Sequence, residues 1–380
     1  MTAMRIGIDA HVLGKNIGGV ERYVGKVVEL VPDLCPQHQF IVFIARRMRS
    51  EFAQDRRRNV QFVTLPVSDP IVQRSVVLPW LVRRHGLDVL HVQRIAPWAC
   101  GRCRILLAVH DLIPIKYPDD YPHFRDRLIR LLTPNSVTRA DLIVCPTQFV
   151  CDDIDRYYPA AAAPKRPFYN GVDYKRFNER KLAPERGTLK RYAIEQPFIF
   201  SPGAIEERKN IEAIIKALAR LNIVSRPLLI LSGSIRDADY FARLQGLARN
   251  LAVAESIRHL GFVPDDDLID LYRHASACVA ASRDEGFNFL PLEAMACGTP
   301  VLCSDIPVHR ELYDGAASFF PPDSPDLLAE AICVVNDGAS ATAEAAKVIV
   351  ARFSWEAMAQ RMATYFEELT CDKPRAARLS

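Results

Sequence analysis

The sequence has no run of apolar residues close to the roughly 18 that a membrane-spanning helix requires. It also has no positively charged and then apolar leader at its start, so we expect a protein without a secretion signal. No G-x-G-x-x-G motif follows a strand-like segment, and a dinucleotide cofactor is therefore poorly supported. These absences favour a cytoplasmic protein.

Metal-binding patterns are also scarce. The ten cysteines are scattered, and most lie in apolar runs, which is typical of reduced, buried thiols. Cys100 and Cys103 form a single C-x-x-C without a second pair, so we expect a loop rather than a zinc site. Asp153 and Asp155 form a D-x-D pattern within a helical segment, which favours a solvated helix face. The sequence therefore predicts no metal site.

The charge is distributed unevenly along the chain. Residues 1–180 hold 27 Lys and Arg against 18 Asp and Glu, whereas residues 181–380 hold 22 against 27. The basic half could meet an anionic membrane surface, where each well-placed cation contributes about 1 kcal/mol, or it could be an ordinary solvated surface. The basic, amphipathic segment Asp119–Leu132 is the candidate for membrane contact, with a plain surface helix as the alternative. No recognised motif supports binding to nucleic acid.

The length of 380 residues and the hydrophobic content of 49% predict two domains. Strand-like runs recur at 4–10, 40–45, 60–65, 89–92 and 105–109, and helical patterns separate several of them. The pair Gly18-Gly19 precedes one such helix, which begins at Val20. Alternating strands and helices predict an α/β fold with doubly wound parallel sheets.

The most informative stretch is Ser282–Ser304, which reads as a loop, a short helix and a buried strand. Pro291 suits the first turn of that helix and Gly298 suits the position just past its end. The loop around Gly286 offers backbone N–H groups at a helix N-terminus, which favours an anion. Glu285 and Glu293 bracket the turn and are expected to accept hydrogen bonds from sugar hydroxyls. An anion site beside hydroxyl acceptors indicates a nucleotide sugar.

Arg208 and Lys209 form a second candidate site. They follow a strand that ends at Gly203 and precede a clear helical pattern from Ile211 to Leu221. Cations are unfavourable at a helix N-terminus, so this placement indicates an anion between them, although an exposed Arg-Lys pair is the plain alternative.

The segment E-G-F-N-F-L-P-L-E-A-M-A-C-G-T-P-V, residues 285–301, resembles the Glu-x7-Glu signature of retaining glycosyltransferases of family four. That resemblance implies the GT-B fold, with two Rossmann-like domains facing across a cleft. It assigns residues 1–180 to an acceptor-binding domain, 181–352 to a donor-binding domain, and 353–369 to a helix that crosses back to the first. It also implies a donor site made of Gly18, Gly19, Gly203, Arg208, Lys209, Phe262, Val263, Glu285, Gly286, Phe287, Asn288, Phe289, Leu290 and Glu293.

The resemblance also implies roles. Arg208 and Lys209 would hold the donor diphosphate, Glu285 would lie near the donor sugar, and Glu293 would bind the ribose. His110, which follows the strand Ile105–Val109, would line the acceptor side, with a core histidine as the alternative. The expected catalytic residues are therefore His110, Glu285, Arg208 and Lys209.

The runs H-D-L-I-P-I-K-Y-P (110–118) and N-G-V-D (170–173) resemble those of bacterial polysaccharide mannosyltransferases. The resemblance implies transfer of mannose from GDP-mannose to a saccharide hydroxyl, with a lipid-linked acceptor in O-antigen or exopolysaccharide assembly. It requires no cofactor beyond the donor and leaves peripheral contact with the inner face of the cytoplasmic membrane open. UDP-hexose-dependent transfer, an epimerase of the same fold and a non-catalytic nucleotide-sugar-binding protein are the alternatives.

Overall fold

The computed structural model describes residues 3–67, 69–179, 187–336 and 343–371. Its contacts divide the chain into two compact units. The first ends at Asn170 and also includes the C-terminal segment from Trp355, and the second is Gly171–Ser354. The sequence analysis predicted a boundary at residue 180. The Val172 N–H donates to the Phe353 carbonyl (3.0 Å), which ties the start of the second unit to its end.

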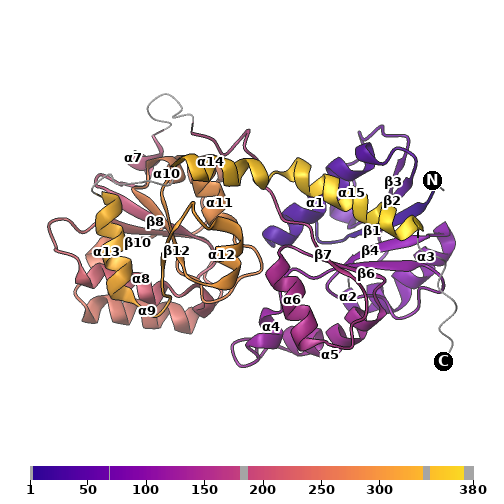
Figure 1. Ribbon diagram of the computed structural model, residues 1–380, viewed down its shortest axis with the longest axis horizontal. Helices are drawn as coiled ribbons and strands as arrows, with labels where there is room; N and C mark the ends of the chain where they lie inside the picture. Colours follow the sequence, from indigo (N-terminus) through magenta and orange to yellow (C-terminus); the bar gives the residue numbers. More distant parts are fainter. Residues whose placement is uncertain (1–2, 68, 180–186, 337–342, 372–380) are drawn as a thin grey trace. The chain divides into compact units, whose positions relative to one another are not determined.

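The first unit contains a seven-stranded sheet in which all strand pairs are parallel (Figure 1). Each strand has few or no polar residues in its buried positions, as expected for a sheet covered on both faces. In spatial order the strands are β3 (Val60–Thr64), β2 (Gln39–Ile44), β1 (Arg5–Ala10), β4 (Val89–Gln93), β5 (Arg104–Ala108), β6 (Leu142–Cys145) and β7 (Lys165–Pro167).

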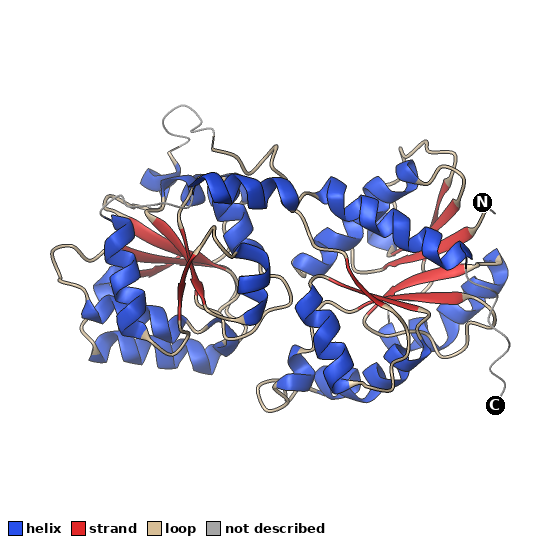
Figure 2. Ribbon diagram, in the orientation of Figure 1, coloured by secondary structure: helices blue, strands red, loops and turns tan. Residues whose placement is uncertain are grey.

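Helices cover both faces of this sheet (Figure 2). On one face, α1 buries a stripe of valines, and Phe366 of α15 packs on Phe40 and His91. On the other face, α3, α5 and α6 contribute to a separate apolar core. The helical elements of this unit are α1 (Gly19–Leu34), η1 (Arg46–Met48), α2 (Pro70–Val72), the π-helix η2 (Gln73–Val77), α3 (Leu78–His85), α4 (Ile113–Lys116), α5 (Phe124–Arg139), α6 (Gln148–Tyr157) and α15 (Trp355–Cys371).

The second unit contains a six-stranded sheet, again with parallel pairing throughout. In spatial order its strands are β10 (Ile257–His259), β9 (Leu228–Ser232), β8 (Phe198–Pro202), β11 (Ala277–Ala280), β12 (Val301–Ser304) and β13 (Ser318–Phe320). Its helical elements are α7 (Thr188–Arg191), η3 (Glu207–Lys209), α8 (Ile211–Arg220), α9 (Ala238–Asn250), η4 (Ala254–Ser256), α10 (Asp265–His274), α11 (Phe289–Ala296), α12 (Pro307–Tyr313), α13 (Pro325–Asn336) and α14 (Ala343–Arg352).

Thr147 caps α6, because its side chain accepts a hydrogen bond from the Val150 N–H. One expectation from the sequence can be checked on the same helix. The interpretation of the D-x-D segment as a solvated face is wrong for Asp153, which is buried and paired with Lys116 at 2.9 Å. Among the helices of the described residues, none is both long and apolar enough to cross a membrane.

Candidate active site

Two loops of the second unit meet at the carboxyl edge of its sheet, where ligand sites of α/β folds form. One loop follows β8 and carries η3, and the other follows β11 and leads into α11. The Arg283 N–H donates to the Arg208 carbonyl (2.9 Å). The Asn210 amide donates to the carbonyls of Ala281 (3.1 Å) and Pro322 (2.9 Å). These bonds fix the two loops side by side.

Arg208 and Lys209 lie in the 3₁₀ turn η3, directly before the helix whose pattern the sequence shows from Ile211. Asn210 has a positive φ of 52° and separates them from α8, which begins at Ile211. Asn tolerates this left-handed conformation better than most residues. Both cations therefore precede α8 rather than lie within its first turn.

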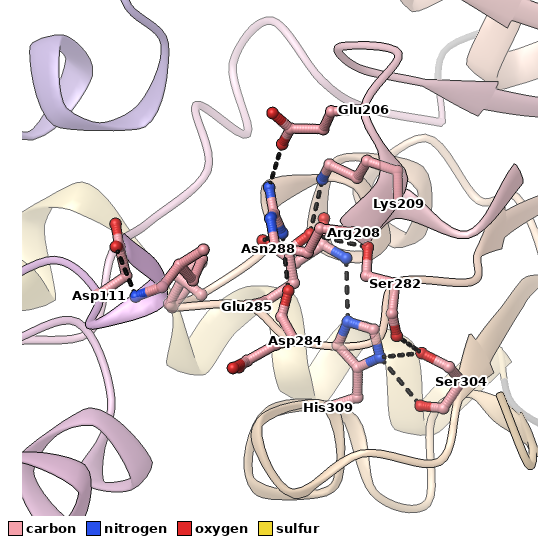
Figure 3. A network of polar contacts seen from close by, with 12 residues as sticks. Asp111, Glu206, Arg208, Lys209, Ser282, Asp284, Glu285, Asn288, Ser304 and His309 are labelled. Atoms are coloured by element: carbon pink, nitrogen blue, oxygen red, sulfur yellow. Dashed lines mark hydrogen bonds and ion pairs between the residues drawn. The ribbon is translucent and has the colours of Figure 1, made fainter. Parts of the chain in front are cut away.

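Glu285 is the anion that lies between these two cations (Figure 3). Its carboxylate is 2.6 Å from Lys209 Nζ and 2.7 Å from Arg208 Nη1, and it accepts a hydrogen bond from Ser282 Oγ (2.8 Å). Burial of Glu285 by itself raises the pKa of its carboxyl, but the charges and hydrogen bonds of Arg208 and Lys209 outweigh that effect and hold the pKa far below its usual range. Glu285 is therefore an anion at every physiological pH.

Glu206 is a second carboxylate at this site that sequence reasoning missed. It is buried, lies 2.5 Å from Arg208 Nη2, and is also 3.4 Å from Arg236 Nη1. Arg208 donates from Nη1 to the Asp284 carbonyl as well (2.7 Å). Arg208 is thus held in one orientation by groups from both loops.

The start of α11 is held by a buried histidine, His309, which the sequence analysis did not select. Asn288 precedes α11 with a φ of 63°, and its amide donates to His309 Nε2 (2.9 Å). His309 Nδ1 in turn donates to the Ser304 carbonyl (2.9 Å), as Figure 3 shows. Burial lowers the pKa of His309 to about 4, so the ring is neutral at pH 7. This neutral histidine holds Asn288 in its strained conformation.

The remaining residues of the Glu-x7-Glu segment are mostly inside the protein. Gly286, Phe287 and Leu290 are buried, and Phe289 is half-buried. Glu293 is buried on α11 and accepts a hydrogen bond from the Tyr272 hydroxyl (2.8 Å). The structure thus places Glu285 and Glu293 in different surroundings, one beside cations and one beside a phenol.

Three glycines, Gly203, Gly233 and Gly261, follow the ends of β8, β9 and β10 at the same edge. The Gly203 N–H donates to Ser232 O (2.8 Å), and the Gly233 N–H donates to Gly261 O (2.7 Å). A Cβ on Gly233 would lie 2.2 Å from Gly203 O, so only glycine allows this close approach. Gly203 also lines a small cavity that Lys209, Ser282, Asn288 and Leu290 border.

Phe262 and Val263 follow Gly261 in the loop after β10. Phe262 is 85% exposed, whereas Val263 is buried. Only Phe262 of this pair therefore offers its side chain to a ligand, and the sequence singled out both.

The other expected site residues lie in the first unit. Gly18 has a φ of 80° and precedes α1, which begins at Gly19. A Cβ on Gly18 would have no atom within 4 Å, so this position faces open space. Glu21 on α1 accepts hydrogen bonds from the N–H groups of Gly14 (2.6 Å) and Ile17 (3.0 Å), which shapes the loop before Gly18.

His110 lies directly beyond β5, buried against the ring of Tyr23 at a centroid distance of 5.1 Å. Its Nε2 donates to Gln93 Oε1 (2.8 Å), which leaves Nδ1 as the acceptor nitrogen. Burial, aided by the charge of Arg94, lowers the pKa of His110 to about 3. His110 is therefore a neutral imidazole at pH 7.

The described ranges contain no group of three or more His, Cys, Asp or Glu side chains arranged to hold a metal ion. The charged groups of the second unit's site are instead paired with one another. The chemistry that this site offers is the binding of an anion by Arg208 and Lys209.

The overall architecture matches solved glycosyltransferases. HepE of Anabaena, crystallised in complex with UDP and glucose, superposes with a TM-score of 0.70 at 18% identity, over 96% of this chain and 100% of that chain. The two parallel α/β units, together with this similarity to solved structures, identify the GT-B fold.

Sequence comparison identifies the family. The model of Glycosyltransferase Family 4 matches residues 17–176, and that of Glycosyl transferases group 1 matches residues 190–339. O-antigen chain mannosyltransferase B of Escherichia coli is 31% identical over 261 residues, 67% of each chain. O-antigen chain mannosyltransferase RfbU of Salmonella typhimurium is 29% identical over 262 residues, 69% of each chain. The chain belongs to glycosyltransferase family 4 and is a retaining hexosyltransferase that uses a nucleotide-sugar donor.

Proposed function

We propose that this enzyme transfers a mannosyl group from GDP-mannose to a hydroxyl of a lipid-linked saccharide during assembly of a bacterial O-antigen or exopolysaccharide. The two O-antigen mannosyltransferases that cover two thirds of the chain support this choice of sugar. A UDP-hexose is the second candidate donor, because HepE, which shares the fold, was crystallised with UDP and glucose.

The observation that carries the proposal is the pair Arg208 and Lys209 at the carboxyl edge of the second sheet. Transfer of a sugar from a nucleoside diphosphate leaves negative charge on the diphosphate. Preorganised cations stabilise this charge in the transition state and so lower the activation barrier of the transfer. The donor diphosphate would bind these two cations and the N-terminus of α11. Gly203, the segment 286–290, Phe262, Val263 and Glu293 would surround the rest of the donor.

Glu285 would have two functions in this site. Before the donor binds, it neutralises Arg208 and Lys209 and keeps both cations in position. When the donor binds, the diphosphate shares the cations, and a carboxylate oxygen becomes available to a sugar hydroxyl. His110 would lie near the acceptor, where its neutral Nδ1 can accept a hydrogen bond from a hydroxyl.

The location that fits this reaction is the inner face of the cytoplasmic membrane. Phe124 and Leu131 on α5 are 75% and 73% exposed, and Arg125 and Arg127 between them are also exposed. Exposed apolar side chains with interleaved cations suit peripheral contact with anionic lipid.

The test is thermal unfolding with GDP, UDP, ADP or dTDP, followed by the corresponding sugar nucleotides. A ligand at a hundred times its dissociation constant adds about 2.7 kcal/mol of stability, which raises the melting temperature measurably. We expect GDP and GDP-mannose to give the largest shift. A larger shift with UDP would replace mannose by a UDP-hexose, and no shift with any nucleotide would overturn the proposed donor site.

A further inference from the structure

The first unit carries a cluster of cations that the donor site does not use. Lys15, Arg47, Arg74, Arg94 and Arg125 follow, in this order, strands β1, β2, β3, β4 and β5. Since these strands are parallel, all five residues lie in loops or helix starts beyond one edge of one sheet. We call these five residues the basic edge.

Hydrogen bonds and an ion pair locate four members of the basic edge. Arg47 donates to the carbonyls of Leu13 (2.7 Å) and Gly14 (3.2 Å), so it lies on the loop that carries Lys15. The Gln73 amide donates to Asp9 Oδ1 (3.2 Å) at the end of β1, which brings the π-helix η2 and its Arg74 to the same place. Arg94 pairs with Asp111 at 2.8 Å.

The positive charge of this edge is incompletely balanced. Asp111 is engaged by Arg94, and the buried Asp9 is bonded to His11 (2.8 Å) and to Gln73. In the described residues, the side chains of Lys15, Arg74 and Arg125 have neither an ion pair nor a hydrogen bond. Three cations therefore lie at this edge without a partner of their own.

The pKa shifts of Arg74 and Lys15 are consistent with cations that lie close together. Burial lowers the pKa of Arg74, Asp9 opposes the change, and the charges of Arg125 and Arg94 lower it further. Burial also lowers the pKa of Lys15, and the charges of Arg47, Arg125 and Arg74 add to that effect, against Asp9. Like charges that are gathered and left unpaired favour a ligand of the opposite sign.

Resting on the proposed function, we propose that the basic edge binds a phosphate or diphosphate group of the acceptor, with Lys15, Arg74 and Arg125 as its contacts. Arginine binds phosphate through two parallel N–H donors, and lysine adds a point charge. The irregular backbone is in keeping with a ligand site, since π-helices such as η2 are frequent at functional sites and Arg94 has a φ of 61°.

Apolar side chains beside the cluster indicate what the phosphate carries. Val76 is 62% exposed near Arg74, and Phe124 is 75% exposed beside Arg125. Exposed apolar groups next to phosphate-binding cations suit a diphosphate attached to a hydrocarbon chain. A water-soluble sugar phosphate would use the cations alone.

The first experiment is calorimetric titration of the full chain with inorganic pyrophosphate at fixed ionic strength. We expect two sites in the wild type, because Arg208 and Lys209 provide one of them. The double variant Arg74→Gln/Arg125→Gln should lose the second site or weaken it at least tenfold, and Arg208→Gln should weaken only the first. Arg127→Gln, on the same helix as Arg125, is the matched control and should leave both sites intact. An unchanged isotherm for the double variant would overturn the proposal.

A kinetic experiment separates the possible sources of the phosphate. The probes are a hexose 6-phosphate, a hexosyl farnesyl diphosphate and a neutral octyl hexoside. The double variant should raise the KM for a phosphate-bearing probe at least tenfold, with kcat and the donor KM unchanged. Preference for the farnesyl probe identifies a lipid-linked source, and preference for the hexose 6-phosphate identifies a soluble one.

Binding to phosphatidylglycerol vesicles gives the remaining control. If the double variant loses vesicle binding but keeps both pyrophosphate sites, the basic edge is a membrane-facing surface and the proposal is wrong. The thermal shift with nucleotides reports on the donor site independently, so a failure of the proposed function remains distinguishable. The melting temperature of each variant shows whether the fold is intact.

Discussion

Glu285 is the residue on which the electrostatics of the second unit's site depends. It is buried, yet it stays ionised because Arg208, Lys209 and Ser282 all contact its carboxylate. Removing one member of a buried ion pair typically destabilises a protein by about 3–5 kcal/mol, since the other charge is left without compensation. Glu285 therefore contributes to stability as well as to ligand binding.

The change Glu285→Gln should have a stability effect that depends on pH. The folded-state pKa of Glu285 is depressed, so its stabilising effect is complete above the unfolded carboxyl pKa of about 4.3 and is lost as the pH falls below it. Urea unfolding at pH 7, 5 and 3.5 should show a large difference between wild type and variant at pH 7 that narrows at pH 3.5. A difference that widens on acidification would contradict the assignment.

The change Lys209→Ala should lower kcat at least tenfold, because the leaving diphosphate loses one of its two stabilising cations. Arg208 and Ser282 still hold Glu285 in that variant, so the site should keep its shape. Steady-state kinetics with the donor identified by thermal shift is the measurement. Lys216→Ala, which removes an exposed helix pair with Glu212, is the control and should leave kcat unchanged. Equal rates for both variants would remove Lys209 from the reaction.

Sequence reasoning selected Glu285, Arg208 and Lys209 but not the contacts among them. The ion pairs join residues 76 or 77 positions apart, and no local pattern encodes that distance. His309 was missed for a similar reason. His309 accepts a hydrogen bond from Asn288, which lies 21 residues earlier in the chain. A single histidine in a Pro-Val-His run does not predict such a distant contact.

At the scale of elements, the ends of the strands determine the shape of the second unit's site. Gly203 and Gly233 bring the ends of β8 and β9 together more closely than any side chain would allow. The segment between them is long, so this contact depends on the sheet register rather than on local sequence.

The change Gly233→Ala should destabilise the second unit and abolish nucleotide binding. The added Cβ would lie 2.2 Å from Gly203 O, and a φ of 118° is strained for alanine. Chemical unfolding and the nucleotide-dependent thermal shift are the measurements. Gly246→Ala is the matched control, because Gly246 lies within α9 with no atom near its Cβ position, and alanine is favoured in a helix by about 1 kcal/mol. The explanation fails if both variants are as stable as wild type.

The periodic elements were largely predictable and the breaks between them were not. Valines at helical spacing specified α1, and short apolar runs specified most strands within one or two residues. The pattern predicted the start of α8 at Ile211, but it did not predict the left-handed turn at Asn210 before it. Contacts of the Asn210 side chain with Ala281 and Pro322 decide in favour of the turn.

At the scale of the whole molecule, each unit has its own apolar core. The first unit also depends on the last described helix, since Phe366 of α15 is fully buried against Phe40 and His91. Tyr365 of the same helix donates to the Pro167 carbonyl at 2.7 Å. The fold of residues 1–170 is therefore completed by a segment from the other end of the chain.

The change Phe366→Ala should destabilise the first unit by about 3–5 kcal/mol, as for other large buried aromatic residues. The second unit should keep its nucleotide-dependent stabilisation, because Phe366 lies outside it. Unfolding followed by calorimetry, with and without nucleotide, checks both statements. Val348→Ala, at an exposed position of α14, should leave the profile unchanged. Loss of the nucleotide response in Phe366→Ala would show that the two cores are not independent.

The position of α15 in the chain has a consequence for synthesis on the ribosome. All of Gly171–Ser354 is made before the segment that the first unit needs, so the second unit can finish folding while the first still exposes the apolar surface that α15 will cover. A nascent chain halted just after Ser354 should therefore present a protease-resistant second half and a sensitive first half, the reverse of the order in which they are translated.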